Sequence, residues 1–213
     1  MNQALRFAFL TALLSSLAAH SMAGTIQTSF STADGFTTGS TAPVSLSDGQ
    51  FAVTFEGGQQ QQFFDGPSYN SGPDAYLFIN GNFNGAVGTN DTGLIDFSVG
   101  VTNVSFFAAN RANGAGVTLN VFGIDDTTLL GSSVVTQTDI RALANPTITE
   151  FLASDFGGNA IGSIQIDLPG PAANPPYALA IDSFSATAVP EPSTLAFLSL
   201  VGIGVVQRRR RRN

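Results

Sequence analysis

Val117-Thr118-Leu119-Asn120-Val121 alternates apolar and polar side chains with a period of two, and Ile164-Gln165-Ile166-Asp167-Leu168 repeats the pattern. In an extended strand successive side chains point to opposite faces, so each segment would bury one face and leave the other in water. Residues 51–55 follow the same rule, because Phe51, Val53 and Phe55 share one face. Half-buried strands of this kind are typical of antiparallel sheets.

Outward from these segments, short apolar or alternating runs continue along the chain, bounded by the turn-forming residues Gly, Asn, Asp and Pro. About ten strands at this spacing favour an all-β fold over a helical protein, and a two-sheet antiparallel β-sandwich of jelly-roll-like form over a barrel. We expect a break at Gly100, loops between 66 and 90 with turns such as Asn80-Gly81 and Asn84-Gly85, and a helical turn at 140–144. The two alternating segments belong to expected strands at 117–124 and 161–168, and the other expected strands are 76–79, 94–99, 101–108, 129–135, 148–152 and 177–187.

The first 23 residues have the three parts of a secretory signal peptide. Arg6 supplies the positive charge, Phe7 to Leu17 the apolar region, and Ser21-Met22-Ala23 the small-residue cleavage site. The alternative is a retained membrane-spanning helix, but the apolar run is too short to span comfortably. We therefore expect an N-terminal signal helix that is removed by cleavage after Ala23.

The C-terminus, residues 189–213, joins a proline-flanked carboxylate to an apolar segment and a block of positive charge. Pro190 and Pro192 disfavour helix in the residue before each of them, so Glu191 is presented on an extended segment. The thirteen residues Thr194 to Val206 carry no charge, and as a helix they reach about 20 Å of a hydrocarbon core about 30 Å thick. Arg208, Arg209, Arg210, Arg211 and Arg212 would stop transfer on the cytoplasmic side. This pattern predicts a transmembrane helix and tail anchor, with a buried helix and basic tail as the alternative.

Val189-Pro190-Glu191-Pro192-Ser193-Thr194, the apolar segment and the terminal arginines together resemble the PEP-CTERM sorting signal. The resemblance implies a Gram-negative source, a transient anchor in the inner membrane, and cutting near Pro190, Glu191 and Pro192 by an exosortase-type transpeptidase. The body would then pass to the cell envelope or extracellular matrix. Residues 97–106 and the later strands are similar to jelly-roll ectodomains that precede such tails. The implied organisation is a signal peptide at 1–23, a β-sandwich at 24–188 and the sorting signal at 189–213.

Charge is distributed unevenly along the 213 residues. Between Gly24 and Val189 only Arg111 and Arg141 oppose fourteen acidic residues, so the net charge of this body is −12. Binding to nucleic acid or to an anionic membrane surface requires clustered Lys or Arg, so electrostatic binding of this kind is excluded. The chain has no cysteine, so the body has to be stabilised by its core rather than by disulfides.

Catalysis by a histidine-activated nucleophile is excluded for the mature body, since the only histidine, His20, lies in the signal peptide. A histidine-ligated zinc site is excluded for the same reason. Paired carboxylates remain, so a secreted glycoside hydrolase stays a less favoured alternative to a non-enzymatic role.

Two binding functions stay open. Calcium prefers carboxylate and carbonyl oxygens on loops, and Asp182 is the first candidate ligand, against the alternative of an ordinary exposed strand carboxylate. A structural calcium ion is thus a possible cofactor, and no other cofactor is expected. Tyr69 and Tyr177 have aromatic rings with polar tips in loop-like surroundings, so they are candidate contacts for exopolysaccharide in a carbohydrate-binding module.

Overall fold

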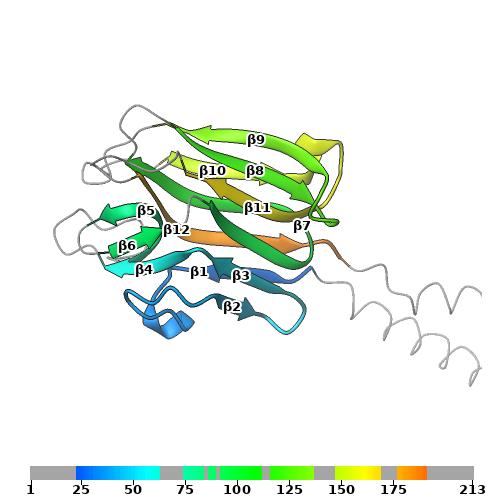
Figure 1. Cartoon of the computed structure of the whole chain (residues 1–213). Coiled ribbons are helices and arrows are strands. Elements are labelled where there is room, and N and C mark those ends of the chain that lie inside the picture. Colours follow the sequence, from blue (N-terminus) through cyan, green and yellow to red (C-terminus); the bar gives the residue numbers. More distant parts are fainter. Residues whose placement is uncertain are drawn as a thin grey trace, which may run out of the picture. The chain divides into compact units, whose positions relative to one another are not determined.

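Strand β7, Thr92–Arg111, is the longest element, and most of the other strands are arranged around it (Figure 1). The computed structural model describes residues 23–62, 74–83, 86–89, 92–111, 116–136, 147–168 and 177–190. The first half of β7 lies between β3, Ala52–Glu56, and β11, Ile161–Asp167. Its second half lies between β10, Thr147–Leu152, and β12, Tyr177–Ala188. The strand therefore belongs to two groups of strands.

The remaining strands extend these two groups, and every pairing is antiparallel. Layer A consists of the first half of β7, β3, β11 and three more strands, which are β2 (Val44–Ser47), β8 (Val117–Gly123) and β9 (Leu129–Val135). Layer B consists of the second half of β7, β10, β12 and four more, which are β1 (Thr25–Thr28), β4 (Gly58–Gln62), β5 (Asp74–Phe83) and β6 (Ala86–Thr89). Two short 3-10 helices, η1 at Thr32–Asp34 and η3 at Ala153–Phe156, complete the described elements.

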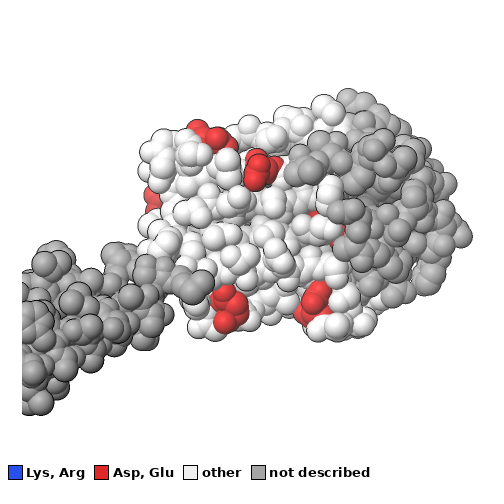
Figure 2. All heavy atoms as spheres, turned by 180° about the vertical axis from the view of Figure 1, so that it is seen from behind, with Lys and Arg blue, Asp and Glu red and all other residues white. Residues whose placement is uncertain are grey.

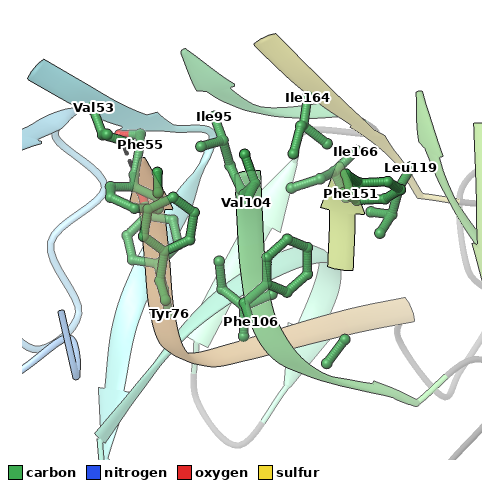
Figure 3. Packing of buried hydrophobic residues seen from close by; sticks show 14 of the residues in the cluster. Val53, Phe55, Tyr76, Ile95, Val104, Phe106, Leu119, Phe151, Ile164 and Ile166 are labelled. Carbon is green, nitrogen blue, oxygen red and sulfur yellow. Dashed lines mark hydrogen bonds between the residues drawn. The ribbon is translucent and has the colours of Figure 1, made fainter. Parts of the chain in front are cut away.

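The core lies between the two layers and is rich in phenylalanine (Figure 3). Phe184 of β12 meets Phe55 of β3 edge to face, with 5.0 Å between the ring centroids. The same ring stacks against Phe97 at 6.5 Å and Phe106 at 6.3 Å, which lie on the two halves of β7. Strand β8 alternates buried and half-buried residues along its whole length. The predicted all-β antiparallel fold is confirmed.

The helices predicted at the two ends fall on residues 1–22 and 191–213, which lie outside the described residues. In the described part of the chain, no helix is long and apolar enough to cross a membrane. Residues 24–189 form one compact unit.

Two predictions about breaks between strands are wrong. Gly100 does not end a strand, because β7 continues through it. Asn80-Gly81 is not a turn, because both residues belong to β5, where Asn80 pairs with Tyr177 on one side and Thr89 on the other. Pairing with neighbouring strands outweighs the local turn preference of these residues. The helical turn predicted at 140–144 lies outside the described residues.

Hydrogen bonds to Asp34 connect the end of β1 to the helix η1 that follows it. Its Oδ2 atom accepts hydrogen bonds from Thr28 Oγ1 at 2.8 Å, from Ser29 N at 3.2 Å and from Ser31 N at 3.3 Å. Burial raises the pKa of Asp34, but the hydrogen bonds from Thr28, Ser31 and Ser29 together outweigh burial and hold the pKa below its ordinary value of 3.8. The carboxylate form is therefore preferred in the folded protein.

The stabilising contribution of Asp34 is expected to be lost in acid. Because its pKa is lower in the folded state, its contribution is complete above pH 3.8 and is lost as the pH falls through the folded-state pKa. Asp34→Asn should lower the free energy of unfolding at pH 7 by about 1 kcal/mol and flatten its dependence on pH below about 4. Urea unfolding at several pH values measures both effects. An equally steep acid loss in the variant would show that other carboxylates control it.

Candidate functional site

The last strand ends where the predicted sorting motif begins. Val189 N–H donates to Gly100 O at 2.9 Å, and Ala188 N–H donates to Gly24 O at 2.9 Å. Pro190 follows and is exposed. The other sorting residues, Glu191, Pro192 and Arg208 to Arg212, lie outside the described residues, so their predicted roles are not tested by the structure.

Strand β1 begins at this same end, since it pairs with β12 from Thr25 opposite Thr187 (Figure 1). Gly24, the first residue after the predicted signal cleavage site, thus lies beside Ala188. The predicted signal cleavage site therefore lies directly before β1, and the predicted sorting motif begins directly after β12, at neighbouring strand ends.

Three side chains converge over Gly100 at this end. A methyl group built on Gly100 would lie 2.8 Å from both Ala160 Cβ and Ile124 Cγ2, and 3.8 Å from Val189 Cγ2. The absence of a side chain at Gly100 therefore allows these neighbours to approach the strand closely. Ile124 is 69 % exposed and is followed by the exposed Asp125 and Asp126. We name Gly100, Ile124, Ala160 and Val189 the exit surface.

The turn after Ile124 is stabilised by Asp125. Its Oδ1 accepts the backbone N–H groups of Thr127 at 3.1 Å and Thr128 at 2.9 Å, and its Oδ2 accepts Thr128 Oγ1 at 2.6 Å. The hydrogen bonds of the Thr128 side chain and backbone and of Thr127 lower the pKa of Asp125 to about 2. The carboxylate is thus negative throughout the physiological range.

Asp182 is fully buried, so the alternative of an exposed strand carboxylate is wrong. It lies in β12 where the pairing with β7 is interrupted, and the next residue, Ser183, has a positive φ of 50°. Ser183 N–H donates to Asp182 Oδ1. The sequence could not show this interruption, because it depends on the register between β12 and β7.

The carboxylates of the body are dispersed. Figure 2 shows the described acidic side chains of one face as separate patches. Among the described residues, no three His, Cys, Asp or Glu side chains are close enough to hold a metal ion together. Burial raises the pKa of Asp96, and repulsion from Asp126 and Glu56 raises it further. The calcium prediction for Asp182 remains a prediction.

A row of polar side chains crosses the outer face of layer A. Asn120 Nδ2 on β8 donates to Asp167 Oδ2 on β11 at 2.6 Å, and Gln165 Nε2 donates to Asp167 Oδ1 at 2.6 Å. Ser132 Oγ on β9 donates to Asn120 Oδ1 at 2.6 Å. We name these four residues the polar row. Phe122, half-buried, lies two residues from Asn120 on the same face.

The residues predicted to contact carbohydrate are not part of this row. Tyr69 lies outside the described residues, and Tyr177 begins β12 opposite Asn80, with a side chain outside the description. Alternation placed Asn120, Gln165 and Asp167 on outer faces, but which strands are neighbours depends on long-range pairing. The exit surface had a weaker signal, an apolar Ile124 directly before two aspartates.

Residues 188–212 match the family model of the PEP-CTERM protein-sorting motif. The sorting signal predicted from the sequence is therefore confirmed. None of the curated proteins matches the chain.

Several solved structures resemble the body at low identity. The K2 cleaved adhesin domain of Lys-gingipain is 12% identical with a TM-score of 0.47, and the match covers 76% of this chain and 99% of that one. The K1 adhesin domain of Lys-gingipain from Porphyromonas gingivalis W83 is 14% identical with a TM-score of 0.45, and the match covers 78% of this chain and 98% of that one. A family 29 carbohydrate-binding module is 10% identical with a TM-score of 0.39, and the match covers 77% of this chain and 89% of that one. At these identities and TM-scores, the ligands and roles of those domains are not transferred to this protein.

Proposed function

We propose that this protein is exported, held in the inner membrane by its C-terminal segment, and cut near Pro190-Glu191-Pro192 by an exosortase-type transpeptidase. The match of residues 188–212 to the PEP-CTERM protein-sorting motif carries this proposal. The released β-sandwich then serves in the cell envelope or extracellular matrix of a Gram-negative bacterium, as a structural and non-enzymatic component.

The residues of the motif have two roles, presenting Glu191 to the enzyme and keeping the chain in the membrane. Pro190 and Pro192 keep Glu191 extended, so its carboxylate and backbone are accessible to an enzyme. The uncharged segment ending at Val206 enters the membrane, and Arg208 to Arg212 keep the tail from passing through. The nucleophile belongs to the enzyme, since the sequence after Ala23 contains neither cysteine nor histidine.

Glu191→Ala is expected to leave the protein full-length and membrane-bound. The anchor and the arginines are unchanged in this variant, whereas the carboxylate between the prolines is lost. Immunoblots of membrane and extracellular fractions, with mass spectrometry of the released C-terminus, measure the effect. Glu150→Ala is the matched control, because Glu150 is an exposed residue of β10 in the body. Normal release of the Glu191 variant would contradict the proposed recognition.

Polysaccharide association is a second candidate function, favoured by the polar row. Its amide, hydroxyl and carboxylate groups are half-buried or exposed and are held by mutual hydrogen bonds of 2.6 Å. Side chains already fixed in this way lose little conformational entropy when they bind sugar hydroxyl groups. The ring of Phe122 on the same face offers an apolar surface for a sugar ring.

The double substitution Asn120→Ala and Gln165→Ala is expected to weaken binding to the exopolysaccharide of the producing strain. Affinity electrophoresis with and without the polysaccharide measures retardation of the released protein. The control replaces Ser45 and Thr54, whose hydroxyl groups are 2.6 Å apart on the outer face of β2 and β3. Equal retardation of both double variants and the wild type would show that the polar row does not bind the polysaccharide.

A further inference from the structure

We propose that the exit surface is a docking surface for the processing enzyme, with exposed Ile124 as its apolar anchor. This inference rests on the proposed function, and it concerns how the enzyme reaches the motif.

The chain allows very little separation between the body and the motif. Val189 is held by its hydrogen bond to Gly100, and Glu191 is two residues further on. A fully extended chain covers about 3.5 Å per residue, so Glu191 lies within about 7 Å of Val189. A single helix with its side chains is about 10 Å across, so even one helix lining an active site is wider than this gap. An enzyme that encloses Glu191 therefore contacts the end of the body.

The surface that it would contact contains an exposed apolar side chain. Ile124 is 69 % exposed although it packs over Gly100 beside Ala160 and Val189. An apolar side chain that is surrounded by polar groups and becomes buried on binding is typical of the residues that dominate interface energies. Asp125 and Asp126 follow it and form such a polar rim.

The occupant that these charges favour is a protein rather than the lipid surface. Thr194, where the apolar segment begins, is five residues beyond Val189, so the chain can separate the start of that segment from Val189 by at most about 17 Å. An anionic bilayer would repel the two exposed aspartates, and the described side chains of the body include no Lys or Arg to attract it. The enzyme, in contrast, has to approach the same place to bind the motif.

The test measures initial cleavage rates of the full-length protein by the purified enzyme of the same strain, with both in a neutral detergent. Ile124→Asp is expected to slow cleavage about tenfold, as the loss of a central apolar contact does. Val134→Asp is the matched control, because Val134 is 55 % exposed in β9 and pairs with Thr118 at the other end of the β8–β9 hairpin. It should be cleaved at the wild-type rate, and both variants should melt as the wild type does.

A second pair of proteins contains a flexible spacer of about eight Gly and Ser residues between Val189 and Pro190, with an end-to-end distance of about 16 Å, so that Val189 stays in the exit surface. The motif then no longer requires contact with the body, so the spacer should abolish the difference between Ile124→Asp and wild type. Wild-type rates for Ile124→Asp at native spacing would overturn the docking surface, as would a defect that persists with the spacer. A defect in membranes but not in detergent would assign Ile124 to the lipid surface. Normal cleavage of Glu191→Ala would instead overturn the proposed function itself.

Discussion

Phe184→Ala is expected to lower the free energy of unfolding by about 4 kcal/mol, a large part of the roughly 5 to 15 kcal/mol that stabilises a typical domain. Phe184 is 1 % exposed and contacts rings from three other strand segments, those of Phe55, Phe97 and Phe106. These rings lie in both layers, so the cavity left by alanine would be lined from both sides. A close-packed core relaxes only partly around such a cavity, and the contacts across it are lost.

Guanidinium unfolding of the released protein, followed by circular dichroism, measures this loss. Phe122→Ala is the matched control, because Phe122 is half-buried on the outer face of β8 and does not belong to the core cluster. The control should lose about 1 kcal/mol or less. Equal losses in the two variants would contradict the assignment of Phe184 to the junction between the layers.

Gly162→Ala is expected to cost about 3 kcal/mol, although it adds one methyl group. Gly162 lies in β11 where the pairing with both β7 and β8 shifts register between Ile161 and Ser163. A methyl group on it would overlap Gly123 O and lie 2.6 Å from Ile124 Cα. These are backbone atoms of the last residue of β8 and of the residue that follows it, so β8 and β11 would have to separate here to accept the side chain.

Gly123→Ala provides the comparison at the same bulge. A methyl group on Gly123 would meet Asp125 Oδ1, Leu130 Cδ2 and Thr128 O at 3.5 to 3.8 Å, which are ordinary contacts. Thermal melts of the two variants should therefore differ by several degrees, with Gly162→Ala the less stable. Similar melting temperatures would mean that β11 and β8 move apart easily at this point.

Local pattern predicted much of the candidate site as well as the fold. The sorting motif is a linear signal, because its prolines, apolar segment and arginines act in sequence order, so no tertiary contact is needed to recognise it. The polar row and the exit surface are different. Ser132, Asn120 and Asp167 come from three strands, and only the register of β9, β8 and β11 brings them together.

The sequence by itself determined that this chain is built from half-buried antiparallel strands and ends in a sorting signal, since side-chain period and proline, apolar and arginine order are local properties. The tertiary structure decided which glycines interrupt strands and which carboxylates are exposed. Gly100 lies within the continuous strand β7 although its residue type favours a break, and Asp182 is fully buried beside an interruption in the pairing of β12 with β7. Both outcomes depend on contacts between residues far apart in the sequence, where long-range pairing and packing outweigh local preference.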